Sequence, residues 1–224
     1  MGRVSDARER LIEAVTDLVW RESYGAVSVD AICERAEVRK GSFYHFFRSK
    51  DELVVAALDA RWLARKARLD VLFADEIEPL ARLNGYFGDL YQHQLELRKR
   101  FGRVVGCFYG SIGTECIESS AIISAKAKAI LKTYARYFEI AIRDAQSQGL
   151  LPKGDAASQA KMLFAYVEGV LGQARIHDDL SLVRQLRRTG LDLLGKEAVR
   201  PKSVRPSNAK AAARSGREAA GARQ

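Results

Sequence analysis

The sequence contains little proline, little cysteine and no long apolar run. Its 4 prolines are spread over 224 residues, which leaves room for long helices, because proline breaks a helix interior. The three cysteines, Cys33, Cys107 and Cys116, form no CxxC pair, so neither a disulfide framework nor a zinc ribbon is expected. No apolar run approaches the roughly 18 residues of a membrane span, and the N-terminus mixes charges where a secretory signal needs an apolar core. We therefore expect a cytoplasmic protein with no membrane association.

The motifs of several common enzyme classes are missing as well. The chain has no HExxH, GxSxG, GxGxxG or GxxxxGK[ST] segment, which are patterns of metalloproteases, serine hydrolases, dinucleotide-binding enzymes and P-loop proteins. The sequence therefore predicts no catalytic residue and no cofactor. A protein that binds a partner is favoured over an enzyme.

Positive charge is unevenly distributed along the chain. The formal net charge is +9, and residues 196–224 alone carry eight Lys and Arg against two Glu, a net of +6. This tail has no aromatic residue, so it cannot bury enough apolar surface to offset its loss of conformational entropy. We expect a disordered basic tail, and the charge makes an acidic partner such as nucleic acid plausible.

Apolar residues recur at helical spacing along almost the whole chain. Leu11, Val15, Leu18 and Val19, for example, fall on one face of a helix. We therefore predict an all-α protein. The expected helices cover residues 5–23 with Ser5 as N-cap, 29–36, 40–47, 50–72, 79–98, 101–118, 121–148, 155–177 and 179–194.

Two of the short helices, 29–36 and 40–47, have the layout of a helix-turn-helix unit. They are joined by three residues, and a long helix follows that begins at the capping box Ser49 to Glu52. Basic, hydroxyl and imidazole side chains crowd the start and outer face of the second helix, whereas Phe43, Phe46 and Phe47 remain to face inward. Such a surface suits phosphates. The alternative is that SFYHFF is only an aromatic core segment.

The segment SVDAICERAEVRKGSFYHFFRSKDELV closely resembles the TetR family of bacterial transcriptional repressors, and the likeness runs from Ala7 to about Trp62. The resemblance implies a three-helix DNA-binding domain followed by a helical domain that binds a ligand and dimerises. It also implies that Ser28 and Lys50 hold phosphates and that Tyr44 and His45 reach the backbone and bases. The full set of expected DNA-binding residues is Ser28, Arg39, Lys40, Gly41, Ser42, Tyr44, His45 and Lys50.

Glu37 departs from the family pattern, which usually has glycine or a small polar residue in the turn between the two helices. If this position is left-handed, a side chain costs on the order of 1 kcal/mol. A carboxylate here would also repel phosphate. Glu37 is therefore expected to weaken DNA binding, but the resemblance to the family still holds.

Glycines and aromatic residues mark a candidate ligand site in the second half. Gly102, Gly106 and Gly110 recur every four residues, so on a helix over 101–118 they would line one face. Close packing of a neighbouring helix is the first interpretation, and room for a ligand is the second. The expected ligand-binding residues are Phe87, Tyr91, Phe101, Gly106, Cys107, Tyr109 and Gly110, with Phe108 nearby. Metal sensing by His93, Cys107 and Glu115 stays open, although no ligand spacing supports it.

Apolar stripes on the last two helices complete the expected plan. One stripe includes Leu163, Val167 and Leu171, and the other includes Val183 and Leu186. Family resemblance implies that these helices meet their two-fold mates in a four-helix bundle, which gives a homodimer. The predicted domains are residues 1–48 for DNA binding, 49–195 for ligand binding and dimerisation, and 196–224 for the tail.

The sequence therefore predicts a homodimeric repressor that binds a palindromic operator in double-stranded DNA. A small-molecule inducer of unknown identity would release it. The alternative is an architectural protein that coats DNA without sequence preference through its basic tail.

Overall fold

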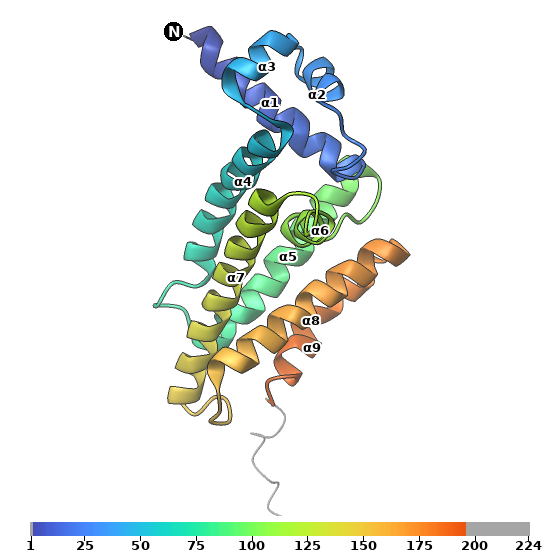
Figure 1. The fold of residues 1–224 in the computed structure, drawn as a ribbon. Helices are drawn as coiled ribbons and strands as arrows, with labels where there is room; N and C mark the ends of the chain where they lie inside the picture. The colour runs from blue at the N-terminus through green and yellow to red at the C-terminus, as the bar shows by residue number, and fades with distance from the viewer. Residues whose placement is uncertain (1, 196–224) are drawn as a thin grey trace, which may run out of the picture.

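A computed structural model describes residues 2–195 and shows them to be helical, with connecting turns and loops and no strand (Figure 1). The expectation of an all-α fold is confirmed. The basic tail, and with it the prediction of disorder, lies outside the described residues. The helices are α1 (Gly2–Arg21), α2 (Val29–Ala36), α3 (Lys40–Phe46), α4 (Lys50–Leu72), α5 (Pro79–Phe101), α6 (Phe108–Glu115), α7 (Ala121–Ser147), α8 (Ala156–His177) and α9 (Leu180–Asp192).

Helices α1, α2 and α3 pack together at one end of the molecule and form a unit that we call the head (Figure 1). Leu11, Ile32 and Phe43, one from each helix, are fully buried, so their apolar surfaces stabilise the unit. The carboxylate of Asp17 on α1 is also buried and accepts hydrogen bonds from Arg21 and from Arg35 of α2. Burial alone would raise the pKa of Asp17, but these two arginines outweigh it and hold that pKa below its usual value.

Side-chain caps fix where the short helices begin. The Ser28 hydroxyl accepts from the Ala31 amide at 3.1 Å, and the Ser49 hydroxyl accepts from the Glu52 amide at 3.1 Å. The Glu52 carboxylate reaches back to the Arg48 amide, so the predicted capping box forms with its return bond one residue earlier. Glu37 ends α2 in the left-handed region at φ 53°, which is the strained conformation foreseen for it.

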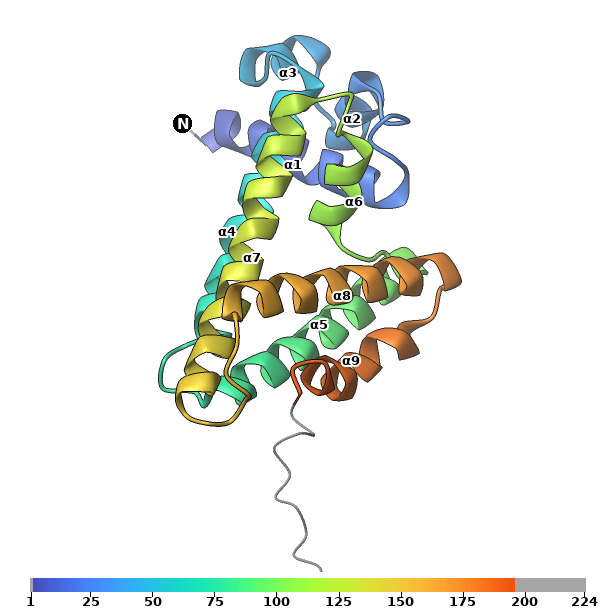
Figure 2. The same cartoon turned by 60° about the horizontal axis from the view of Figure 1, so that its bottom comes forward.

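Helices α4 to α9 form the rest of the described chain, which we call the body. Figure 2 shows α4 and α7 running side by side, with α5, α8 and α9 on the other side of α7. Phe87 and Phe138 are fully buried at its centre. Gly190 lets α9 approach α5 closely, because a Cβ there would lie 2.7 Å from the Phe87 ring. The long helix α4 begins beside the head, where it contacts α1, and runs along the body next to α7 (Figure 1).

Two predicted helices differ from the structure. Helix α1 begins at Gly2, so Ser5 lies inside it and is not its N-cap. The predicted helix over 101–118 is wrong: α5 continues to Phe101, Gly102 ends it in the left-handed region at φ 75°, and α6 starts only at Phe108. Gly106 lies in the intervening loop at φ 76°. The three glycines therefore do not share a helix face, and only Gly110 is helical.

None of the helices between residues 2 and 195 is both long and apolar enough to cross a membrane.

Candidate functional site

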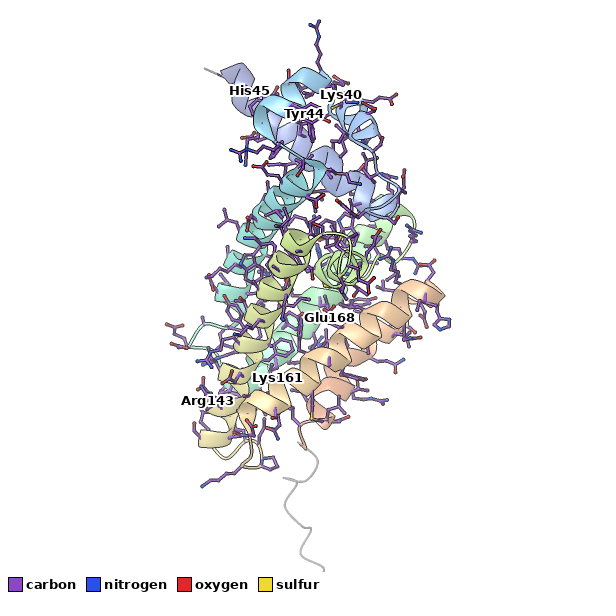
Figure 3. The ribbon with its side chains drawn as sticks, in the orientation of Figure 1. Lys40, Tyr44, His45, Arg143, Lys161 and Glu168 are labelled. Carbon is purple, nitrogen blue, oxygen red and sulfur yellow. The ribbon has the colours of Figure 1, made fainter. Side chains whose placement is uncertain are left out.

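The outer face of α3 presents the polar side chains that the sequence singled out. Lys40, Tyr44 and His45 lie at the end of the molecule farthest from Glu168 of the body (Figure 3). Tyr44 is 53% exposed although its ring edge packs on Phe43, and Phe43 itself is fully buried. Arg39 and Gly41 are exposed beside them, and Ser42 is half-buried. SFYHFF is thus both a core segment and a polar surface, divided by helical periodicity.

The two lysines expected to hold phosphates sit in different surroundings. The Lys40 ammonium is exposed and pairs with Asp30 of α2 at 2.7 Å. The Lys50 ammonium turns toward the head, where it donates to the carbonyls of Tyr24 and Val27 at 2.9 and 2.8 Å and lies 4.0 Å from the Tyr24 ring centre. Lys50 therefore holds the turn between α1 and α2 onto the start of α4.

A cavity of about 890 Å³ lies where the head meets the body. Its walls come from α1, α4, α5, α6, α7 and α8 and from the loop before α6. Trp20 lines the cavity from α1, Arg61 lines it from α4 and Tyr134 lines it from α7. A second cavity of about 490 Å³ lies alongside it, and the two share walls that include Cys107 and Glu168.

Only some of the predicted ligand residues line these cavities. Gly106, Cys107 and Tyr109 line the larger cavity, and Gly110 lines the smaller one. Phe87, Tyr91 and Phe101, which were also predicted, line neither cavity. Phe87 is fully buried against α9, and Phe101 packs on Trp20 at 6.0 Å between ring centres.

The cavity walls also contain charged residues that no sequence motif indicated. Asp89 of α5 pairs with Arg65 and with Arg68, which lies 2.6 Å away. Glu168 of α8 lies beside the Cys107 thiol and against α6, where its carboxylate occupies the space that a Cβ on Gly110 would need. Burial raises the pKa of Glu168 to about 7 and raises that of Cys107 well above its usual value. These residues come from elements that are distant in sequence, so no local motif connects them.

Glu115, the last residue of α6, joins the cavity wall to the head. Its two carboxylate oxygens accept hydrogen bonds from the amides of Tyr24 and Gly25 at 3.0 and 2.9 Å. Asp51 at the start of α4 accepts from the Tyr24 hydroxyl and from Ser120, which precedes α7. The turn after α1 is therefore bonded to both α4 and α6.

Grouped metal ligands are absent from the part of the chain that the structure describes. The suggestion of a metal held by His93, Cys107 and Glu115 is not supported there. Glu115 is instead bonded to two backbone amides of the head.

Comparison with known proteins gives two family matches. Residues 11–57 match the model described as bacterial regulatory proteins, tetR family. Residues 79–189 match the model described as tetracyclin repressor-like, C-terminal domain. The two matches cover the head with the start of α4, and the body from α5 into α9.

Individual relatives agree with these matches. The chain is 31% identical to the transcriptional regulator AcuR of Cereibacter sphaeroides, over 76% of this chain and 77% of that one. It is 30% identical to the HTH-type transcriptional repressor NemR of Escherichia coli K12, over 76% and 85%. A solved structure of a regulatory protein TetR from Rhodobacter sphaeroides is 30% identical, covers 82% of this chain and 96% of its own, and has a TM-score of 0.71.

Proposed function

Since this chain belongs to the TetR family of transcriptional regulators, which bind DNA and are not enzymes, we propose that it is a homodimeric repressor released from a palindromic operator by a small-molecule inducer. The DNA-binding residues would be those on the outer face of α3 together with Ser28, Arg39 and Lys50. We place it in the cytoplasm, with the DNA.

The observation that carries the proposal is the double role of α1. Ile12, Thr16 and Trp20 form one wall of the larger cavity. Leu11 and Asp17 of the same helix hold α2 and α3 in place from inside the head. A ligand that favours another position of α1 or α6 would therefore move the recognition helix α3. By linkage, DNA must weaken ligand binding by the factor by which the ligand weakens DNA binding.

The outer face of α8 supports the dimer. Leu163, Val167 and Leu171 are buried against this chain's own core, so they do not form the free face. The exposed face instead contains Met162 and Ile176, each 72% exposed. Gly169 and Gly172 lie between them, and a Cβ added at either glycine would meet no atom within 4 Å. Small residues on an exposed apolar helix face suit close packing of a symmetry mate.

Selection of bound DNA from a random pool tests the proposal. Footprinting of the selected site then shows its symmetry, and light scattering of the free protein measures its oligomeric state. We expect a dimer and a palindrome whose half-sites are ~34 to 36 Å apart, because two recognition helices must enter successive major grooves. A chain that binds all DNA equally would instead be the architectural protein. Its expected contact, the tail, lies outside the described residues.

A further inference from the structure

Two nitrogen donors in the larger cavity have no hydrogen-bond acceptor among the described residues. They are Nε of Arg61 and the indole nitrogen Nε1 of Trp20. Trp20 is only 4% exposed, and the Arg61 guanidinium lies over its ring at 5.3 Å and over that of Phe108 at 4.9 Å. A buried donor without an acceptor is costly in a native protein, so its presence calls for an explanation.

Arg61 also differs from the other arginines of this cavity in having no carboxylate partner. Arg65 and Arg68 share Asp89, and Arg100 pairs with Asp17. Among the described residues, Arg61 forms no such ion pair. Burial together with the charges of Arg65 and Arg61 lowers the pKa of the neighbouring His93, which favours the neutral imidazole, so His93 adds no second positive charge.

The acidic groups of the cavity lie elsewhere on its wall. Glu13 and Glu96 are exposed, and Glu168 lies beside Cys107 and Gly110, where the two cavities meet. The Arg61 guanidinium lies over the rings of Trp20 and Phe108. This corner thus offers one guanidinium without a carboxylate partner and two N–H donors beside aromatic rings.

We propose that the larger cavity takes a small organic carboxylate with a planar unsaturated or aromatic body, whose carboxylate oxygens accept from Arg61 and Trp20. The planar body lies among Trp20, Phe108 and Tyr109. A carboxylate fits because it is acceptor-only and can use both donors, whereas a cation would be repelled and a neutral hydrocarbon would leave both donors unsatisfied. This inference rests on the proposed function in taking the cavity as the inducer site.

Binding of matched neutral and charged probes tests the inference. Cinnamate and cinnamamide have nearly the same shape, and only the first has a negative charge. The protein has two tryptophans, so Trp62→Phe leaves Trp20 as the only tryptophan fluorophore, and quenching of that signal reports occupancy. We expect cinnamate to bind about 10- to 100-fold more tightly than cinnamamide, the range for a hydrogen bond to a charged group.

Substitution of Arg61 identifies the group responsible. Arg61→Gln should reduce cinnamate binding to the level of cinnamamide, and Arg61→Lys should restore part of the preference. Lys66→Gln removes the same charge from the exposed side of α4 and should leave the preference unchanged. Equal binding of the two probes, no binding of either at millimolar concentration, or an unchanged preference in folded Arg61→Gln would overturn the inference.

Release of operator DNA is measured separately, so that the two proposals fail in different ways. If cinnamate binds through Arg61 but leaves operator affinity unchanged, the carboxylate site stands and the inducer role of the cavity is wrong. If cinnamate does not bind, while other compounds release the operator from Arg61→Gln as well as from the unchanged protein, the repressor stands and the carboxylate inference is wrong.

Discussion

The head and the cavity use charged residues in opposite ways. On α3 most polar groups are exposed and close together in sequence, and the ion pair of Lys40 with Asp30 lies on the surface. The charged residues around the cavity come from four helices, α1, α4, α5 and α8, and carboxylates hold Arg65, Arg68 and Arg100 among them. A face that binds a long polyanion needs many accessible charges of modest individual effect. A cavity that selects one small molecule needs few charges, each held in place.

The largest expected effect is the difference in stability between substitutions on the buried face of α3 and substitutions on its exposed face. Phe43→Ala should lower the free energy of unfolding by about 3 to 5 kcal/mol, because a fully buried ring is lost, and DNA binding should fall with it. Tyr44→Phe and His45→Ala should leave the unfolding free energy unchanged within about 0.5 kcal/mol and weaken the selected operator. Thermal unfolding and operator titration measure both. A large loss of stability in the Tyr44 or His45 variant would mean that SFYHFF is only core.

Lys40 and Lys50 allow the same comparison between an exposed side chain and one that is bonded to the head. Lys40→Ala should lower the slope of log affinity against log salt by about 0.9, the value for one phosphate contact, without changing stability. Lys50→Ala should also lower the unfolding free energy, by about 1 to 3 kcal/mol, because it removes two charged hydrogen bonds to Tyr24 and Val27. Equal melting temperatures for the two variants would contradict the structural role of Lys50.

The sequence was sufficient where neighbours in the chain are also neighbours in space. The positions around Glu37, Phe43 and Ser49 follow from local rules for turns, helix periodicity and caps, and the bounds of α2 and α3 were predicted to within one residue. The cavity was not, because Arg61, Asp89 and Glu168 come from three helices and meet only through packing. The glycine pattern misled for a related reason: Gly102 and Gly106 allow left-handed backbone, and their four-residue spacing has no helical meaning.

The carboxyl group of Glu168 in the cavity wall predicts that the stability of the protein depends on pH. Glu168 has a folded-state pKa of about 7, above its ordinary 4.5. The folded chain therefore keeps this proton where the unfolded chain has lost it, so the contribution of Glu168 to stability falls as pH rises from about 4.5 to 7. Glu168→Gln should be more stable than the unchanged protein at pH 8, by on the order of 1 to 3 kcal/mol, and the difference should disappear near pH 4.5. Denaturant unfolding at both pH values measures it.

The smallest expected effect concerns the pair on the head. Asp30→Asn frees Lys40 and removes a negative charge beside the recognition helix, so operator affinity should rise by about two- to fivefold, as for an exposed ion pair. The gain should shrink as salt is added. Unchanged operator affinity at low salt would show that Lys40 does not touch DNA.

Release of DNA by a ligand depends on a connection between cavity and head, and a double-mutant cycle on operator affinity tests it most directly. Ala64→Phe fills the larger cavity from α4, and Glu115→Ala removes the bonds to Tyr24 and Gly25. Ala67→Phe, on the same helix but outside both cavities, is the control. We predict that the effects of Ala64→Phe and Glu115→Ala differ from additivity by more than about 0.5 kcal/mol, whereas Ala67→Phe and Glu115→Ala add. Additive effects within about 0.5 kcal/mol for the first pair would contradict coupling through α6.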